Sequence, residues 1–194
     1  MRCPHCGVGE IEKDNCSNCT WPYSLEGWKQ YNRGIKRLSI DTGCINAKGN
    51  LASLNTLERW KNEGKLEIQR ASSFLEEFRG PDHHVKKAKE ISELPALFFL
   101  GSSILGRRDV LAGPDLRDVV KTILFPTVAI LNQNQEYDVQ HLHEHIRSGG
   151  DIFVTLNLKD FIYSGKKEKL RKYGVWVLTP DETLCLIDDL YGWS

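Results

Sequence analysis

Short apolar runs alternate with segments of helical spacing from about residue 37 onward. Arg37 to Asp41 and Leu66 to Arg70 are segments of strand length with apolar residues at every second position, and we expect both to form strands. A helix is predicted between them, from about Lys48 to Asn62, and Gly64 ends it. Its core stripe consists of Leu51, Leu54, Leu57 and Trp60. Ser72-Ser73 caps a further helix. This alternation predicts an α/β fold with a central parallel sheet flanked by helices.

The second half of the chain continues the alternation of predicted strands and helices. In chain order the predicted elements are a helix at 115–124, a helix from Asp138 to the Gly149-Gly150 break, a strand at 151–155, a basic helix at 166–172, a strand at 175–178 and a helix capped by Thr179 with Pro180 and Glu182. Residues 83–89 suggest a helix with a solvated basic face, and Pro95 to Leu105 is either a strand or a buried loop.

Composition adds little to this picture. The 194 residues are 40% hydrophobic and 27% charged, as in an ordinary globular protein with room for one domain and a small appendage. Lysine plus arginine and aspartate plus glutamate both number 26, so net charge favours no partner. The most apolar run, Leu94 to Leu105, is too short and too broken to span a bilayer. We expect a cytoplasmic protein with no membrane partner.

The cysteines change the picture at the N-terminus. Cys3 and Cys6 form one Cys-x-x-Cys turn, and Cys16 and Cys19 form a second. Two such turns predict a structural zinc site in a ribbon over residues 1–24, because four thiolates close a tetrahedral shell. The alternative is four free thiols on a loose tail. Cys44 and Cys185 lie in apolar surroundings, so we expect both to be buried packing residues.

Aromatic residues follow the ribbon into a predicted linker at residues 25–36. Trp21, Tyr23, Trp28 and Tyr31 could stack on bases while nearby lysines and arginines meet phosphates. The same rings could instead pack the ribbon onto the main domain at 37–194, since large aromatic side chains usually bury most of their area.

Acidic residues stand at the ends of several predicted elements. Asp41 closes the first strand, Glu77 lies in the helix after the second, and Asp138 opens a helix. Asn157 and Asp160 follow the strand at 151–155. Carboxyl ends of parallel strands meet at one edge of a sheet, so these side chains can converge on one cleft. Such a cluster suits Mg²⁺ or Mn²⁺ and predicts phosphodiester cleavage.

The helix from Asp138 also carries histidines, two of which lie on the same face as Asp138. Val139, Leu142 and Ile146 form its predicted buried stripe, and His141 and His145 lie with Asp138 on the neighbouring face. We expect His141 to orient Asp138 or a substrate and His145 to lie on the surface. The alternative for Asp41 and Asp138 is a purely structural role as helix caps.

These motifs together resemble those of PIN-domain nucleases over about residues 37–190. The matching segments are Ile40-Asp41-Thr42 with Asn46, Phe74 to Phe78, Asp138 to His141, Phe153 to Asn157, Asp160-Phe161 and Gly174 to Pro180. The resemblance implies an α/β Rossmann-type three-layer fold. It also implies RNA cleavage with Mg²⁺ or Mn²⁺ held by three or four acids.

Carried over by position, the resemblance gives each site residue a role. Asp41 is the first metal ligand, Glu77 the second acid (Glu76 if the register shifts by one) and Asp138 the third. The fourth acid is replaced by Asn157, which keeps an oxygen but loses a charge, and Asp160 matches a further acid.

The remaining expectations concern substrate and partners. Thr155, His141 and Lys159 are the expected substrate-binding residues, and the basic run at 166–172 either guides an RNA backbone or is a solvated helix face. RNA is the expected partner, and the resemblance leaves a cognate protein inhibitor and a homodimer open. Because Asn157 departs from the family pattern, the alternative function is a degenerate RNA- or protein-binding adaptor.

Overall fold

The computed structural model of the chain describes residue 3 and residues 8–31, 34–47, 49–71, 82–94 and 116–193, without the side chains of residues 82–84 and 87. Several predicted features lie outside these residues: Cys6, the helix after Ser72-Ser73 with Glu76 and Glu77, and the segment from Pro95 to Leu105.

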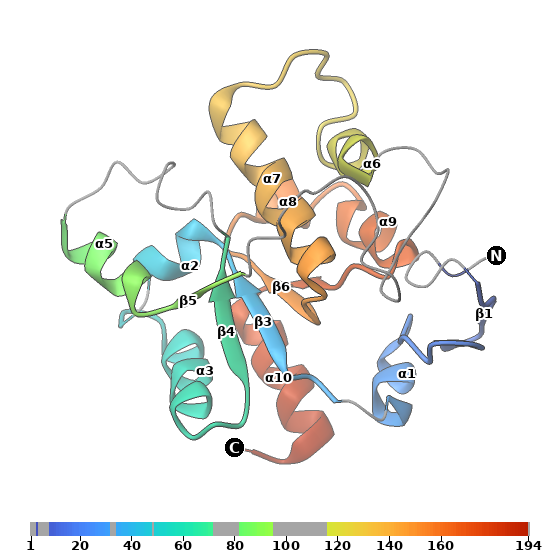
Figure 1. Cartoon of the computed structure of the whole chain (residues 1–194), viewed down its shortest axis with the longest axis horizontal. Helices are drawn as coiled ribbons and strands as arrows, with labels where there is room; N and C mark the ends of the chain where they lie inside the picture. The colour runs from blue at the N-terminus through green and yellow to red at the C-terminus, as the bar shows by residue number, and fades with distance from the viewer. Residues whose placement is uncertain are drawn as a thin grey trace, which may run out of the picture.

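The centre of the fold is a five-stranded sheet whose strands all run parallel, in the order β5-β4-β3-β6-β7 (Figure 1). The strands are β3 (Arg37–Ile40), β4 (Glu67–Arg70), β5 (Ser92–Glu93), β6 (Ile152–Val154) and β7 (Val177–Leu178). The first half of the chain builds outward from β3 through β4 to β5, and the second half builds from β6 to β7 on the other side. This reversal of strand order makes the boundary between β3 and β6 the switch point of the sheet.

Helices cover both faces of the sheet, which confirms the three-layer α/β prediction. Alternate residues of β6 point to opposite faces, as the period of a strand requires. Ile152 and Val154 pack with α2 (Thr42–Ala47), α3 (Ala52–Asn62) and α10 (Pro180–Tyr191). Phe153 packs with the opposite layer, which contains α6 (Leu116–Leu124), α7 (Gln133–Ser148), α8 (Leu158–Phe161) and α9 (Lys166–Lys172). A further helix, α5 (Asp82–Lys89), lies beside α2 (Figure 1).

The local signals of the last helix proved reliable. Thr179 caps α10, with its hydroxyl accepting the Glu182 N–H at 3.2 Å and the Glu182 carboxylate accepting the Thr179 N–H at 3.0 Å. The helix predicted at 48–62 is different. A separate helix, α2, begins directly after β3, and α3 starts only at Ala52. The prediction missed α2, which leaves no loop after the strand. The backbone oxygen of Asp41 already accepts the N–H groups of Cys44 and Ile45.

The N-terminal segment packs onto the main domain through its aromatic residues. It contains β1 (Ile11–Glu12), β2 (Asn15–Cys16) and the short helix α1 (Leu25–Gln30). Two buried indoles each donate a hydrogen bond to a backbone carbonyl across the junction. Trp21 Nε1 donates to Gly174 O at 2.8 Å, and Trp176 Nε1 donates to Pro22 O at 3.0 Å. The packing interpretation of these aromatics is therefore confirmed.

Two further observations concern the rest of the described chain. Cys44 is buried as predicted, but Cys185 is exposed, so its predicted packing role is wrong. The buried residues of α10 are Pro180, Thr183, Leu186 and Ile187, and position 185 falls on the other side of the helix. None of the helices described here is long and apolar enough to cross a bilayer.

Candidate functional sites

Three of the four N-terminal cysteines lie together. The Sγ atoms of Cys3, Cys16 and Cys19 all lie within 4.8 Å of one another, which allows them to hold one metal ion. The backbone N–H groups of Asn18 and Cys19 both point at Cys16 Sγ, at 3.4 Å, and such donors stabilise a thiolate. The Tyr23 hydroxyl lies 3.1 Å from Cys3 Sγ. This donor set suits a soft ion such as zinc.

A second candidate site is a cavity of about 320 Å³ at the carboxyl ends of β3 and β6, at the switch point of the sheet. Asp41, Asp138 and Asn157, which come from three distant segments, line it together with Thr42, Gly43 and Leu156. The structure thus brings three of the predicted site residues to one cavity. Thr42, Gly43 and Leu156 were not among the predicted site residues, although each lies within three residues of the end of β3 or β6.

Asp41 is fixed by its neighbours on both sides. Its backbone N–H continues the sheet by donating to Val154 O at 3.0 Å. Carboxylate oxygen Oδ1 accepts the Thr42 N–H at 2.7 Å, and Oδ2 accepts the Thr155 hydroxyl at 2.8 Å. Only 6% of Asp41 is exposed. The residue therefore starts α2 and presents its carboxylate to the cavity, so the capping role and the cavity role hold together.

Asp138 reaches the cavity from the second turn of α7. The helix begins at Gln133, because Asn132 and Gln135 form a capping box: Asn132 Oδ1 accepts the Gln135 N–H at 3.0 Å, and Gln135 Oε1 accepts the Asn132 N–H at 3.0 Å. The prediction that Asp138 opens this helix is wrong. Since Asp138 is not at the helix start, the purely structural role as a cap does not apply to it.

His141 and His145 of α7 are both buried, and they contact different partners. His141 Nδ1 lies 3.9 Å from Asp41 Oδ1, and its ring stacks on Tyr137 with the centroids 6.4 Å apart. His145 is 2% exposed, so its predicted place on the surface is wrong. Its Nδ1 lies 2.8 Å from the Ser39 hydroxyl. Ser39 faces α7 from the middle of β3, and a buried hydroxyl there requires a polar partner.

The segment after β6 is organised around Thr155 and Asn157. The Thr155 hydroxyl donates to Asp41 and accepts the Asn157 N–H at 2.9 Å, with no exposed surface of its own. Thr155 therefore acts on the site through Asp41. Asn157 caps α8: its Oδ1 accepts the Asp160 N–H at 3.2 Å, and its Nδ2 donates to Asp160 Oδ2 at 3.0 Å. The amide at position 157 is thus bonded to Asp160 through both of its polar atoms.

The acids of this site do not form one close group. In the described residues, the cysteine group is the only set of three or more ligand atoms that all lie within 4.8 Å of one another. Asp41, Asp138 and Asp160 do not form such a set. Asp160 stands behind Asn157, to which it is bonded. Glu77 and its alternative Glu76 lie outside the described residues.

The acids near the cavity act on the pKa values of neighbouring ionisable groups. Burial and the negative charge of Asp41 raise the pKa of the Cys44 thiol far above its ordinary value, so the group stays protonated. Partial burial lowers the pKa of Lys166, while Asp160 and Asp138 act in the opposite direction. Lys159 is exposed, and its carbonyl accepts a hydrogen bond from Lys166 Nζ at 3.0 Å. Lys166 was foreseen only as part of the basic run.

Comparisons of the chain with protein-family models, with curated proteins and with solved structures found no match. The assignment of a function therefore depends on the residues and on the geometry described above. The resemblance to PIN-domain nucleases stays a prediction.

Proposed function

We propose that the protein is a metal-dependent endoribonuclease of PIN-like type, which hydrolyses RNA phosphodiester bonds at the cavity between β3 and β6. The observation that carries this proposal is the convergence of Asp41, Asp138 and Asn157 on that cavity. These residues come from β3, α7 and the turn after β6, and ligand sites of open α/β sheets form at this place.

The residues that line the cavity suit a hard divalent cation. Asp41 and Asp138 offer carboxylate oxygens, which Mg²⁺ and Mn²⁺ prefer over nitrogen or sulfur. A volume of about 320 Å³ leaves room for a hydrated cation beside a phosphate group. When bound, such a cation would activate a water and neutralise the charge that develops on the phosphodiester.

The protein's own residues hold the site in place. The Thr155 hydroxyl and the Thr42 N–H fix both oxygens of Asp41, so this carboxylate has little freedom to turn. His141 lies behind the same carboxylate and supports it from α7. Preorganisation of this kind favours catalysis, because ligands that are already oriented need not reorganise during the reaction.

One observation favours the alternative, a degenerate nuclease fold that binds RNA or a protein without cutting it. The amide of Asn157 is engaged with Asp160 through both polar atoms. An acid at this position would add a negative charge for a cation, and the amide does not. Under this alternative the protein binds its partner but shows no turnover.

The role of the ribbon in the proposed function follows from its position. The ribbon packs on Gly174 and Trp176, which lead into the amino end of β7, whereas the cavity lies at the carboxyl ends of β3 and β6. We expect its metal to be structural zinc. Any contact of the ribbon with nucleic acid or a partner protein would therefore lie away from the cavity.

The experiment that tests the proposal is a cleavage assay on mixed RNA and DNA with Mn²⁺, with Mg²⁺ and with chelator. We expect RNA cleavage that requires the metal and falls on the order of a hundredfold or more in Asp138→Ala. The matched control is Asp189→Ala, because Asp189 is an exposed acid on α10. Undiminished cleavage in Asp138→Ala, or cleavage in chelator, would refute the assigned site. RNA binding without turnover would support the adaptor.

A further inference from the structure

We propose that Lys166 is a phosphate-binding residue at the edge of the cavity, which holds a backbone phosphate of a single-stranded nucleic acid next to the phosphate that is cut. The inference rests on the proposed function, because it places this strand at the cavity lined by Asp41 and Asp138. It concerns a residue to which the resemblance gives no role.

The side chain of Lys166 is anchored on two sides. Its ammonium donates to Lys159 O at 3.0 Å and lies 5.5 Å from the centroid of the Phe125 ring, which is itself buried. These contacts fix the ammonium and shield part of it from water. A lysine held in this way loses less conformational freedom when it binds an anion than a free surface lysine does.

The ammonium of Lys166 still has donors to offer. A lysine ammonium carries three N–H groups, and one is used by Lys159 O. With the residues that the structure describes, Lys166 forms no ion pair. Two N–H groups are therefore available to the oxygens of a phosphate, which a cation binds more strongly than it binds a neutral acceptor.

The hydrogen bond to Lys159 O holds Lys166 against the segment that lines the cavity, because Lys159 lies two residues after Asn157 and next to Asp160. Asp160 and Asp138 both attract Lys166, and partial burial lowers its pKa in opposition to them. Lys159 and Lys169 lie near enough to repel it. A phosphate at this position would relieve the repulsion among the three lysines, while a divalent cation at Asp138 would balance the acids. The arrangement suits a nucleic-acid strand that contacts both Lys166 and a cation at Asp138.

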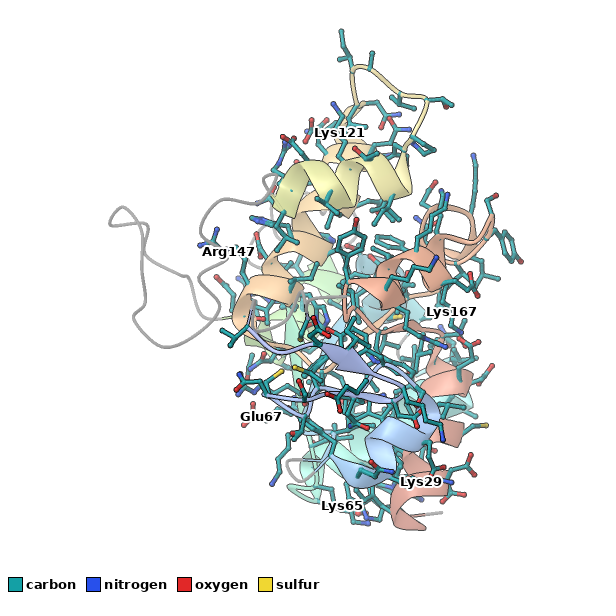
Figure 2. All side chains as sticks on the ribbon, turned by 90° about the vertical axis from the view of Figure 1, so that its right-hand side faces the viewer. Lys29, Lys65, Glu67, Lys121, Arg147 and Lys167 are labelled. Atoms are coloured by element: carbon teal, nitrogen blue, oxygen red, sulfur yellow. The ribbon has the colours of Figure 1, made fainter. Side chains whose placement is uncertain are left out.

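Three of the other four cations of α9 are placed differently from Lys166. Lys167, labelled in Figure 2, pairs with Glu182 of α10 at 2.5 Å, and only 14% of its side chain is exposed. Arg171 stacks over the Trp176 ring at 4.3 Å. Lys172 is exposed and absent from the groups that act on Lys166. Lys166 is therefore better placed for the backbone than these three residues, and Lys172 belongs to a solvated face.

The test is the affinity for a short fluorescent single-stranded RNA, measured by anisotropy in chelator so that no cleavage occurs. We expect Lys166→Gln to weaken binding by about five- to tenfold. It should also reduce the slope of log K against log salt by about 0.7, the value for one phosphate contact on a single strand. Lys166→Arg should bind like wild type. Lys172→Gln removes the same charge from the same helix and should stay within about twofold, with the slope unchanged.

Each outcome decides the inference separately from the proposed function. Equal losses in Lys166→Gln and Lys172→Gln, or no binding by the wild-type protein, would overturn the phosphate site. If Lys166→Gln weakens binding but Asp138→Ala cleaves normally, the phosphate site stands and the nuclease site fails. If Lys166→Gln binds normally and Asp138→Ala is inactive, the reverse holds. Loss of the difference between wild type and Lys166→Gln in millimolar inorganic phosphate would support the phosphate site, because both anions need the same ammonium.

Discussion

The substitution Asn157→Asp tests how the cavity balances its charges. Asn157 Nδ2 donates to Asp160 Oδ2 at 3.0 Å, and Asn157 Oδ1 caps α8. Aspartate caps a helix as well as asparagine does, so the capping bond survives the change. The donor to Asp160 is lost, however, and a second carboxylate takes its place. The substitution therefore sets two negative charges against each other unless a cation joins them.

The size of this effect follows from the geometry. Two unit charges about 4 Å apart repel by about 4 kcal/mol at an effective dielectric of 20. Both side chains are half-buried, so screening by water reduces this repulsion to about 1 kcal/mol. Loss of the hydrogen bond to a charged acceptor adds about 1.5 kcal/mol. A total of about 2–3 kcal/mol corresponds to a fall in Tm of roughly 5–10 °C for a chain of this length.

The assay is thermal unfolding in chelator and in Mn²⁺. In chelator we expect Asn157→Asp to show the full fall in Tm. A divalent cation at about 100 times its dissociation constant stabilises the folded state by about 2.7 kcal/mol, so Mn²⁺ should recover most of the loss. Cleavage activity should rise in the same variant, because the added charge strengthens metal binding.

The matched control is Asn157→Ser, which keeps a capping oxygen and removes the donor to Asp160 without adding a charge. Its Tm should fall less than that of Asn157→Asp in chelator, and Mn²⁺ should change it no more than it changes wild type. Equal Tm values for the two variants in both conditions would refute the reasoning that position 157 belongs to a metal site.

Three further predictions concern the support of the two sites. Thr155→Val should lower the free energy of unfolding in urea by about 2–3 kcal/mol, since it removes the hydroxyl donor of the buried Asp41 carboxylate, whereas Thr155→Ser should cost about 1 kcal/mol; equal losses would contradict this role. Cys16→Ser should reduce bound zinc, measured by atomic absorption, to background and lower the Tm, while Cys185→Ser should change neither. Iodoacetamide at pH 8 should label Cys185 in the folded protein and leave Cys44 unmodified by mass spectrometry, because burial and Asp41 raise the pKa of Cys44; labelling of Cys44 at the same rate would show that it is accessible.

Local signals in the sequence predicted local structure well. The last helix begins where Thr179, Pro180 and Glu182 place it, since capping depends on residues within one turn. The same kind of signal was present at the start of α7 but was overlooked, because Asn132 and Gln135 also have the spacing of a capping box. The predicted start at Asp138 lies in the second turn of α7, which begins at Gln133.

Non-local partners could not be predicted from the pattern. His145 is polar and looks like a surface residue on a helical wheel, but Ser39, which faces α7 from β3, provides its partner. Likewise, the sequence places Asp41 and Thr155 at the ends of strands without showing that these strands are neighbours. The convergence of the cavity residues depends on β6 pairing with β3, and this pairing is a property of the whole fold.

The insertion of β6 beside β3 has a consequence for synthesis of the chain. Asp41 and Thr155 are separated by 114 residues, which a ribosome adds in roughly 6 to 23 s at about 5–20 residues per second. During that interval β3 can pair with β4 but presents an open edge on its other side, where unpaired N–H and C=O groups invite a foreign strand. The nascent polypeptide is therefore most exposed to misassociation at the same edge that later carries the acidic cavity.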